Sequence, residues 1–269
     1  MKIWKIARTI LLTIAGLLGL SVLALAGLIG YDTLFPGEKV AELTNVTYPG
    51  PDGITLQAYL AQPEGPGPHP AVLMVHEFYG LRKDIIKKAD LLAKEGYVVL
   101  AVDAYRGKTT TLIPRAIWLV MTTPQERISA DIDAGYTYLT GLPAVNPQRI
   151  GAVGFCFGGT QTLQLGIRNN QLAANVIYYG SGLVTQPAGL GSLGQTGPVL
   201  GIFGELDNSI PLEEVNAFQA AMQQRGITNT VTVYPGVGHA FVNTESMDQP
   251  GPAQQAWQQM ETFLAQNLQ

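Results

Sequence analysis

A cysteine inside a glycine-rich turn is the residue of this chain most suited to covalent chemistry. Cys156 stands in the segment 154–159, Gly-Phe-Cys-Phe-Gly-Gly, which follows an apolar run and opens a helical pattern. A nucleophile elbow turns so sharply that it needs small residues two positions before and two after the nucleophile, and glycines stand at both places. The amides at a helix N-terminus favour a thiolate, and the N–H of Phe157 would face a developing oxyanion. The segment predicts a cysteine nucleophile, although the same glycines would also suit a tight turn around an inert buried cysteine.

A general base must be one of only three histidines. His239 lies in the glycine-rich segment 235–241, directly after a short strand pattern, and loops of this kind carry catalytic bases. His76 closes a buried strand pattern and is the second candidate, because it could also be a satisfied, hydrogen-bonded residue near the site. His69 stands between two prolines in a surface segment, so we expect it to be solvated and incidental.

Asp207 is the expected orienting acid, since it follows the strand pattern 199–203. The chain order is then nucleophile, acid, base, as in α/β-hydrolases. Its carboxylate would fix the imidazole tautomer and stabilise the imidazolium form. Glu205 is the nearest competitor for this role. Other aspartates are interpreted as structural, namely Asp103 at a strand end and Asp131 and Asp133 as solvated or capping charges on a helix.

Short apolar runs alternate with helical patterns along the chain, and this alternation must position the three residues. Apolar strands of this kind indicate a mostly parallel sheet with helices on both faces, an α/β fold. Sites in such sheets lie at the C-terminal ends of the strands, where Cys156, Asp207 and His239 all fall. The expected strands are 54–61, 71–75, 97–102, 150–153, 173–179, 199–203 and 231–234, and the expected helices are 81–95, 124–139, 157–167, 212–225 and 253–267.

The N-terminal segment 9–31 carries no charge and is long enough to cross the ~30 Å hydrocarbon core as a helix. Basic residues precede it and mainly acidic ones follow, which predicts a catalytic domain on the non-cytoplasmic side. A cleaved signal peptide, with a site near 24–26, is the alternative and would give a secreted or periplasmic domain. The apolar run is longer than the usual h-region of ~7–15 residues, so we expect an uncleaved membrane anchor.

The rest of the chain has the length of one domain with a full core. We expect a membrane anchor or signal segment in 1–31, a polar linker and first strand region in 32–53, and one catalytic domain in 54–269. Charged residues make up 13%, the net charge is −4 and no basic run occurs, which argues against nucleic acid as a partner. With a single cysteine, neither an intramolecular disulfide nor a multi-cysteine metal site can form.

The motifs together resemble the dienelactone hydrolase family of the α/β-hydrolase superfamily. They are the elbow at 154–159, Val-His-Glu-Phe-Tyr-Gly at 75–80, Asp207, and Gly-His-Ala-Phe at 238–241, and the similarity runs from about residue 54 onward. The resemblance implies the α/β-hydrolase fold. It also implies that Glu77 is the carboxylate that keeps the cysteine neutral at rest and frees it when substrate enters. The backbone N–H groups of Phe78 and Phe157 would form the oxyanion hole.

The positions that would contact substrate depart from the family pattern in two places. Lactone-cleaving members hold a substrate carboxylate with two arginines. Here Arg106 follows Tyr105, one position away from the family's place, and Asn243 stands where the second arginine would be. Tyr105 and Arg106 are therefore candidate substrate-binding residues, while the pattern argues against a dianionic, dienelactone-like substrate. The apolar segment 113–121 lies between a strand and a helix, either as a lid or as a buried turn of helix.

The expected reaction is hydrolysis of a small-molecule carboxylic ester or lactone through a thioester on Cys156. It calls for no metal or organic cofactor. A non-catalytic, membrane-tethered binding domain with the same fold is the alternative from another class. A third interpretation keeps the enzyme but changes the bond to a thioester or an acyl-peptide. The sequence patterns do not specify an oligomeric state.

Overall fold

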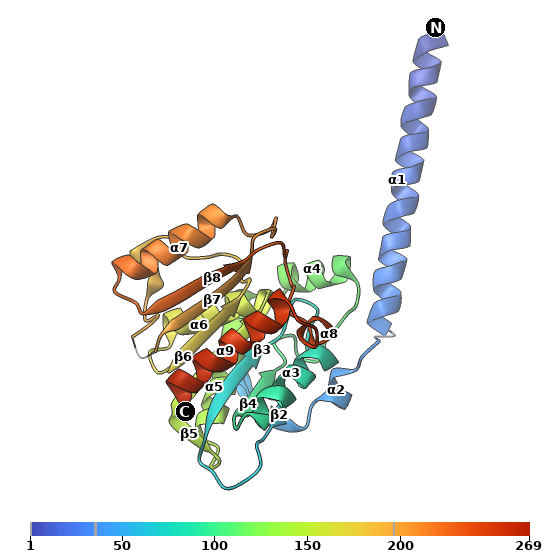
Figure 1. The fold of residues 1–269 in the computed structure, drawn as a ribbon. Coiled ribbons are helices and arrows are strands. Elements are labelled where there is room, and N and C mark those ends of the chain that lie inside the picture. Colours follow the sequence, from blue (N-terminus) through green and yellow to red (C-terminus); the bar gives the residue numbers. More distant parts are fainter. Residues whose placement is uncertain (1, 35–36, 196) are drawn as a thin grey trace.

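The structure is a computed structural model that describes residues 2–34, 37–195 and 197–269. Its strands form one eight-stranded sheet in the order β1-β2-β4-β3-β5-β6-β7-β8 (Figure 1). Pairs β1–β2 and β2–β4 are antiparallel, and every other neighbouring pair is parallel. This confirms the predicted mostly parallel α/β sheet. The strands are β1 (Val46–Pro49), β2 (Thr55–Ala61), β3 (His69–Val75), β4 (Val98–Val102), β5 (Val145–Phe155), β6 (Ala174–Tyr178), β7 (Val199–Gly204) and β8 (Asn229–Tyr234).

Helices cover both faces of the sheet, with α3 and α9 on one face and α5 and α6 on the other (Figure 1). Each helix buries an apolar stripe against the strands, as the helical spacing of its sequence requires. In α9, for example, Trp257, Met260 and Leu264 are buried. The helices are α1 (Lys2–Leu34), α2 (Val40–Leu43), α3 (Lys83–Lys94), α4 (Ile113–Thr122), α5 (Gln125–Thr140), α6 (Phe157–Arg168), α7 (Leu212–Gln224), α8 (Thr244–Met247) and α9 (Pro252–Leu268), with short 3₁₀ turns η1 (Pro51–Gly53) and η2 (Pro187–Leu190).

The central strands are buried on both faces because helices cover them on each side. Every residue of β4 and β7 is buried, and so are the last five residues of β3. Side chains on such strands all meet apolar neighbours, which is why these segments appear in the sequence as unbroken apolar runs. The C-terminal ends of β3, β5 and β7, all parallel, therefore meet at one edge of the sheet.

The N-terminal region contains more regular structure than a linker and one strand. Helix α1 runs on to Leu34, three residues beyond the expected end, and the polar stretch after it contains α2 and the edge strand β1. Two residues of that stretch, Phe35 and Pro36, and Met1 of the anchor segment lie outside the described residues. The expected first strand region, 32–53, contains β1, a four-residue edge strand that pairs with β2.

Segment 113–121 is helix α4, which is partly buried and partly exposed. Arg115, Ala116 and Leu119 are buried, whereas Trp118 and Met121 are 61% and 77% exposed. The segment is thus a helix, as the alternative of a buried turn of helix expected, but only one of its faces is buried; the lid interpretation remains a prediction.

Candidate active site

The turn at Cys156 has the backbone geometry of a nucleophile elbow. Cys156 caps α6 directly after β5 and has φ +55°, ψ −115°, a left-handed conformation that costs strain in a residue with a side chain. The two glycines predicted for the turn are sterically required. A Cβ on Gly154 would lie 2.0 Å from the carbonyl oxygen of Gly158, and one on Gly158 would lie 2.2 Å from that of Val75. No other residue type fits at either position.

The structure brings together the three side chains that the sequence singled out. His239 Nε2 lies 3.0 Å from Cys156 Sγ, and His239 Nδ1 lies 2.7 Å from Asp207 Oδ2. Because Nδ1–H donates to the carboxylate, the Nε2 lone pair faces the sulfur. The three residues follow β5, β7 and β8, so their convergence comes from the parallel ends of these strands.

Ser209 is a member of this cluster that sequence reasoning missed. Asp207 Oδ1 accepts hydrogen bonds from the Ser209 backbone N–H at 2.9 Å and from its hydroxyl at 2.5 Å. Burial alone would raise the pKa of Asp207, but the bonds from Ser209 and His239 outweigh it and lower that pKa. The carboxylate is therefore ionised at neutral pH. A serine two residues after a strand-end aspartate is a common turn arrangement, and it was the available signal.

The Cys156 thiol is neutral at rest. Its pKa is raised to about 11, first by burial and then by the nearby carboxylate of Glu77, while the backbone N–H groups of Phe157 and Phe78 act in the opposite direction. The amides that lower this pKa do so by hydrogen bonding, so both point at the sulfur. The same two N–H groups are available to an oxyanion formed beside the sulfur.

Glu77 lies just past the C-terminal end of β3 and close to Cys156. Burial raises the pKa of its carboxyl group, and the Lys88 ammonium is the strongest opposing influence. Lys88 is fully buried; its ammonium lies 2.6 Å from Asp84 Oδ2 and 4.2 Å from the centroid of the Phe155 ring. A buried lysine was not among the expected site residues, because it resembles a solvated helix position in the sequence.

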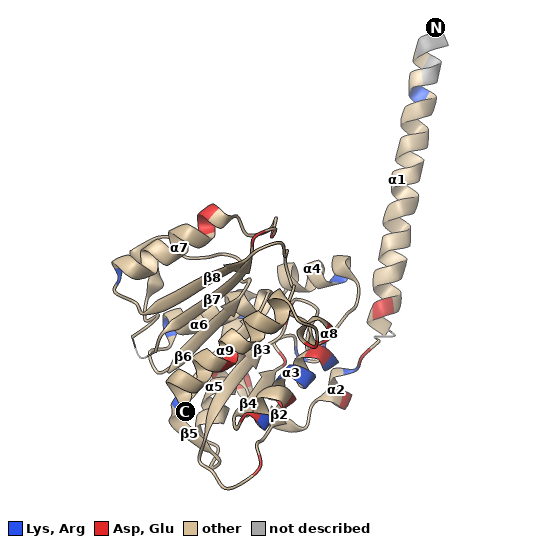
Figure 2. Cartoon of the chain, in the orientation of Figure 1, with Lys and Arg blue, Asp and Glu red and all other residues tan. Residues whose placement is uncertain are grey.

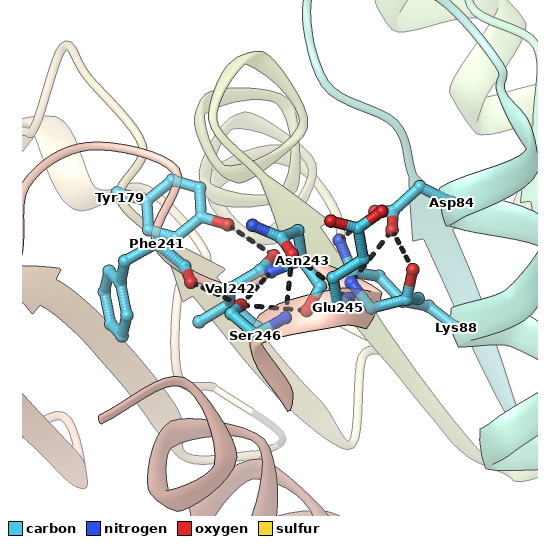
Figure 3. A network of polar contacts seen from close by, with 9 residues as sticks. Asp84, Lys88, Tyr179, Phe241, Val242, Asn243, Glu245 and Ser246 are labelled. Carbon is cyan, nitrogen blue, oxygen red and sulfur yellow. Dashed lines mark hydrogen bonds and ion pairs between the residues drawn. The ribbon is translucent and has the colours of Figure 1, made fainter. Parts of the chain in front are cut away.

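A polar network ties the chain beyond His239 to α3 (Figure 3). Asp84 Oδ1 accepts from the backbone N–H of Thr244 at 2.9 Å and from its hydroxyl at 2.7 Å. Ser246 donates its hydroxyl to the carbonyl of Phe241, and the Tyr179 hydroxyl donates to the carbonyl of Val242. These bonds hold the segment that follows His239, so they support the position of its imidazole.

The two other histidines are engaged in structural contacts. His76 is fully buried; its Nδ1 lies 2.6 Å from the carbonyl oxygen of Glu77, and its Nε2 accepts from the N–H of Ala104 at 3.1 Å. Burial lowers the pKa of His76 to about 4, so the ring is neutral. His69 opens β3 and therefore lies at the opposite edge of the sheet from Cys156. Neither ring is placed to take a proton from the sulfur.

The competing carboxylates also have partners of their own. Glu205 accepts from the N–H of Gly236 at 2.9 Å, and Asp103 accepts from the N–H groups of Tyr105 and Gly107 in the turn after β4. Burial raises the pKa of Asp103 to about 6. Asp133 is 47% exposed and pairs with Arg168, as expected of a solvated charge.

The interpretation of Asp131 as a solvated or capping charge was wrong. Asp131 is 2% exposed, and its two carboxylate oxygens each lie 2.7 Å from the guanidinium of Arg106. Helix α5 packs against the turn after β4, so this residue faces inward rather than toward solvent. The arginine that we considered for substrate binding thus already has a carboxylate partner.

Tyr105 and Asn243, the remaining residues at the substrate positions, also lie in structural surroundings. The Tyr105 ring is buried and packs 5.1 Å from His76 and 5.2 Å from Phe157, measured between ring centroids. Asn243 caps α8 and accepts from the N–H groups of Glu245 and Ser246. Its side chain therefore stabilises a helix start where a family arginine would bind an anion.

One helix among the described residues is long and apolar enough to cross a membrane. It covers the 28 residues Ala7–Leu34; its most apolar 18-residue window has a mean hydropathy of 2.4, and none of that window is buried against the protein. A signal sequence near an N-terminus has the same properties. Figure 2 shows charge near the two ends of α1 and none along its middle.

A family model and individual relatives of known sequence point to the same protein family. Residues 56–268 match the family model described as "Dienelactone hydrolase family". A candidate carboxymethylenebutenolidase from Methylorubrum extorquens is 31% identical over 233 residues, which cover 82% of this chain and 80% of that protein. A candidate 2-oxo-3-(5-oxofuran-2-ylidene)propanoate lactonase from Bradyrhizobium is 32% identical, with 81% of this chain and 92% of that protein covered.

A solved structure of similar sequence shares the fold. The crystal structure of a candidate dienelactone hydrolase from Klebsiella pneumoniae subsp. pneumoniae superposes with a TM-score of 0.70 at 29% identity. The match covers 82% of this chain and 98% of that one. The part of this chain without a counterpart there is small, and α1 precedes the family match at residue 56.

Proposed function

This chain belongs to the dienelactone hydrolase family and is an ester or lactone hydrolase, and we propose that it acts through a thioester on Cys156. In this proposal His239 transfers the protons, Asp207 orients the imidazole, and the N–H groups of Phe78 and Phe157 bind the oxyanion. The single observation that carries the proposal is the imidazole of His239, 3.0 Å from the sulfur on one side and 2.7 Å from the carboxylate on the other.

The first half-reaction forms the thioester. His239 Nε2 takes the thiol proton while the sulfur attacks the carbonyl carbon, and the carbonyl oxygen becomes an oxyanion between the two amides. Collapse of this intermediate breaks the C–O bond to the leaving group. The imidazolium then gives its proton to the departing alkoxide. In a lactone the released hydroxyl stays attached to the acyl group.

The second half-reaction returns the enzyme to its resting state. His239 takes a proton from water, the resulting hydroxide attacks the thioester carbonyl, and the carboxylic acid leaves as the sulfur is expelled. The thiolate then takes the proton from the imidazolium. Since the pKa of Cys156 is about 11 at rest, the neutral thiol is restored at physiological pH. We assign to Glu77 the role of holding the thiol in this neutral state between turnovers.

We propose that the substrate carries no carboxylate close to the scissile bond. Arg106 is already paired with Asp131, and Asn243 caps α8. Neither residue presents a cation to an anionic substrate. An ester or lactone without a carboxylate beside the reacting carbonyl fits these surroundings better than a dianionic one.

We propose further that α1 remains attached as a membrane anchor, with the catalytic domain on the non-cytoplasmic side. Lys2, Lys5 and Arg8 precede the apolar stretch, and their excess at this end supports that orientation. The expected result is an intact N-terminal segment in protein extracted from membranes, measured by mass spectrometry of the mature chain. A mature chain that begins after residue 26 would contradict the anchor and leave the catalytic proposal untouched.

The catalytic proposal is tested by Cys156→Ala in the full chain. We expect turnover of a small aryl ester to fall by about 10³-fold or more, as when a triad nucleophile is removed. Intact-mass analysis after rapid acid quenching should detect an acyl adduct in the unmodified chain and none in the variant. Unchanged turnover, or an adduct that survives the substitution, would contradict the assignment. The melting temperature of the variant serves as the control for folding.

A further inference from the structure

Exposed apolar side chains in the body of the protein are concentrated on one short helix. Outside α1, seven large hydrophobic side chains are exposed among the described residues, and five of them belong to α4. Large apolar side chains gathered on one exposed face mark an interaction surface. We call these five the α4 surface: Ile113, Ile117, Trp118, Val120 and Met121.

The α4 surface carries no charge. Arg115 is the only charged residue of α4, and its side chain is buried together with Ala116 and Leu119 on the opposite face. Figure 2 shows the helix in tan except at this arginine. Leu119 packs in the same apolar cluster as Tyr105 and Phe157. The inner face of α4 is thus joined to the surroundings of the nucleophile, while its outer face offers only hydrocarbon and an indole.

All seven exposed side chains lie on the active-site side of the sheet. The α4 surface follows the C-terminal end of β4, and the two others, Leu206 and Leu212, follow that of β7. Leu206 immediately precedes Asp207. Because these strands run parallel to β5, their ends meet at the edge where Cys156 stands.

A buried ion pair joins α4 to the end of α1. The Asp32 carboxylate lies 2.5 Å from Arg115 Nη1 and accepts from the Thr110 hydroxyl at 2.6 Å. Asp32 and Arg115 are each 6% exposed. An acidic residue in the last turn of a helix is unfavourable for the helix dipole, so this contact offsets a cost within α1. It places the α4 surface beside the point where the apolar helix leaves the domain (Figure 1).

We infer that the α4 surface lies in the interfacial layer of the bilayer that α1 enters, and that the enzyme takes an apolar, lipid-dissolved ester or lactone from that bilayer. The inference rests on the proposed anchoring and extends the proposed function to a substrate class. Tryptophan side chains are enriched at membrane–water interfaces, where the indole ring sits at the level of the headgroups. Trp118 supplies that indole, next to the most exposed side chain of the helix, Met121.

A second copy of the chain is the rival occupant, and the size of the surface argues against it. A stable dimer buries ~800 Å² on each partner. Ten helical residues extend over only ~15 Å, so α4 alone offers much less than that area. The bilayer is already beside α4 once α1 is inserted, and it needs no complementary shape.

Spin labels on the full chain in lipid vesicles test the position of the surface. Since the chain has one cysteine, Cys156→Ser leaves a background in which Met121→Cys carries the only label. Gln148→Cys is the matched control, because Gln148 is exposed near the start of β5, at the opposite edge of the sheet. Vesicles of phosphatidylcholine and phosphatidylglycerol provide the bilayer.

We expect the label at 121 to be more accessible to oxygen than to a water-soluble nickel chelate, and the label at 148 to show the reverse. Equal access of the chelate to both positions would overturn the inference. Protection at 121 that disappears as the lipid-to-protein ratio is raised would also overturn it, because a second copy would then be the occupant. Persistent protection at high lipid content supports the bilayer.

Activity tests the substrate class separately. In the unmodified active-site background, Ile117→Ser with Met121→Ser should slow hydrolysis of 4-nitrophenyl palmitate dissolved in the vesicles by about fivefold or more. Hydrolysis of water-soluble 4-nitrophenyl acetate should stay within about twofold. An equal loss on both esters would overturn the substrate class. If neither ester is hydrolysed by the unmodified chain, the proposed function fails, while the spin labels still decide the position of α4.

Discussion

Around His239 the polar side chains find partners within the chain, whereas on α4 five large apolar side chains lie exposed. The imidazole, Asp207 and Ser209 bond to one another, and the segment that follows is bonded to α3 through Asp84. On α4 only the inner face has a polar partner within the protein, because Arg115 pairs there with Asp32. The first region is complete by itself, because its geometry depends on contacts inside the protein. For the second region we infer a contact with a medium outside the domain, because its apolar side chains have no cover among the described residues.

Replacing Asp207, the proposed orienting acid, is expected to have the largest effect on this comparison. Asp207→Asn keeps the shape of the side chain but removes the charge that fixes the imidazole tautomer. We expect kcat on a small aryl ester to fall by ~10³–10⁴-fold, as for other triads. Steady-state kinetics of the full chain measure the loss.

Glu205→Gln is the matched control, because it makes the same change two residues earlier. The Glu205 carboxylate bonds the N–H of Gly236 and not the imidazole, so kcat should change little. A comparable loss in both variants would mean that the loop, rather than the Asp207–His239 contact, governs activity.

Breaking the network on the His239 side should cost global stability. Asp84→Asn leaves the fully buried ammonium of Lys88 without its carboxylate. Breaking a buried pair costs ~3–5 kcal/mol, and the lower end applies because Asp84 is 32% exposed. We therefore expect the free energy of unfolding in urea to fall by about 3 kcal/mol. Asp90→Asn, on the same helix, is the control, because its side-chain oxygen can still accept the hydrogen bond from the Tyr59 hydroxyl. An equal loss of stability in Asp90→Asn would mean that the buried pair of Asp84 and Lys88 is not the cause.

The contribution of Asp84 should also depend on pH in a defined direction. Burial would raise its pKa, but Lys88 and Thr244 outweigh it and hold the pKa below the ordinary value of 3.8. A carboxyl group whose pKa is lower in the folded than in the unfolded state stabilises the fold fully at a pH above its unfolded-state pKa. This stabilisation is lost as the pH falls through its folded-state pKa. The difference in stability between the unmodified chain and Asp84→Asn should therefore shrink below about pH 4. A difference that grows toward acid would contradict the sign.

Breaking the ion pair on the other side should loosen α4 without unfolding the protein. Asp32→Asn removes the charge that faces the buried guanidinium of Arg115. We expect hydrogen exchange of the α4 amides to accelerate by ~10²-fold, with the sheet unchanged, because local opening is cheaper than global unfolding. Glu42→Gln removes an exposed pair with Lys39 and should have no measurable effect. Unchanged exchange in α4 would show that the pair does not hold the helix.

Removing the Glu77 carboxylate beside Cys156 should have the smallest effect, and it should increase a reaction rate rather than lower it. Glu77→Gln removes one cause of the raised pKa of Cys156, so the alkylation profile with iodoacetamide should move to lower pH. Each unit by which the pKa of Cys156 falls increases the thiolate fraction at neutral pH tenfold, but it also makes the thiolate less nucleophilic. We therefore expect alkylation at neutral pH to be about threefold faster for each unit of decrease in this pKa. Glu205→Gln again serves as the control. A slower rate in Glu77→Gln would contradict the repulsive role of this carboxylate.

Sequence patterns predicted the sheet and the three converging residues because these depend on local rules. The buried strands are continuous apolar runs, and the elbow glycines stand where a Cβ would collide with backbone. Polar partners at long sequence separation could not be predicted in the same way. Lys88 resembles any solvated helix lysine, and Asp131 resembles any helix aspartate, until packing turns one toward Phe155 and the other toward Arg106.

The amino-acid sequence alone determined the class of fold, the glycines of the turn at Cys156 and the chain order of Cys156, Asp207 and His239, since steric conflicts and hydrophobic periodicity act between near neighbours. The tertiary structure alone decided which charges are neutralised, that Ser209 joins the acid, and that α4 turns an uncharged face outward next to α1. The physical reason is that burial and partner choice depend on which elements meet in space. A side chain in the sequence carries its chemistry, but its neighbours decide its charge state and exposure.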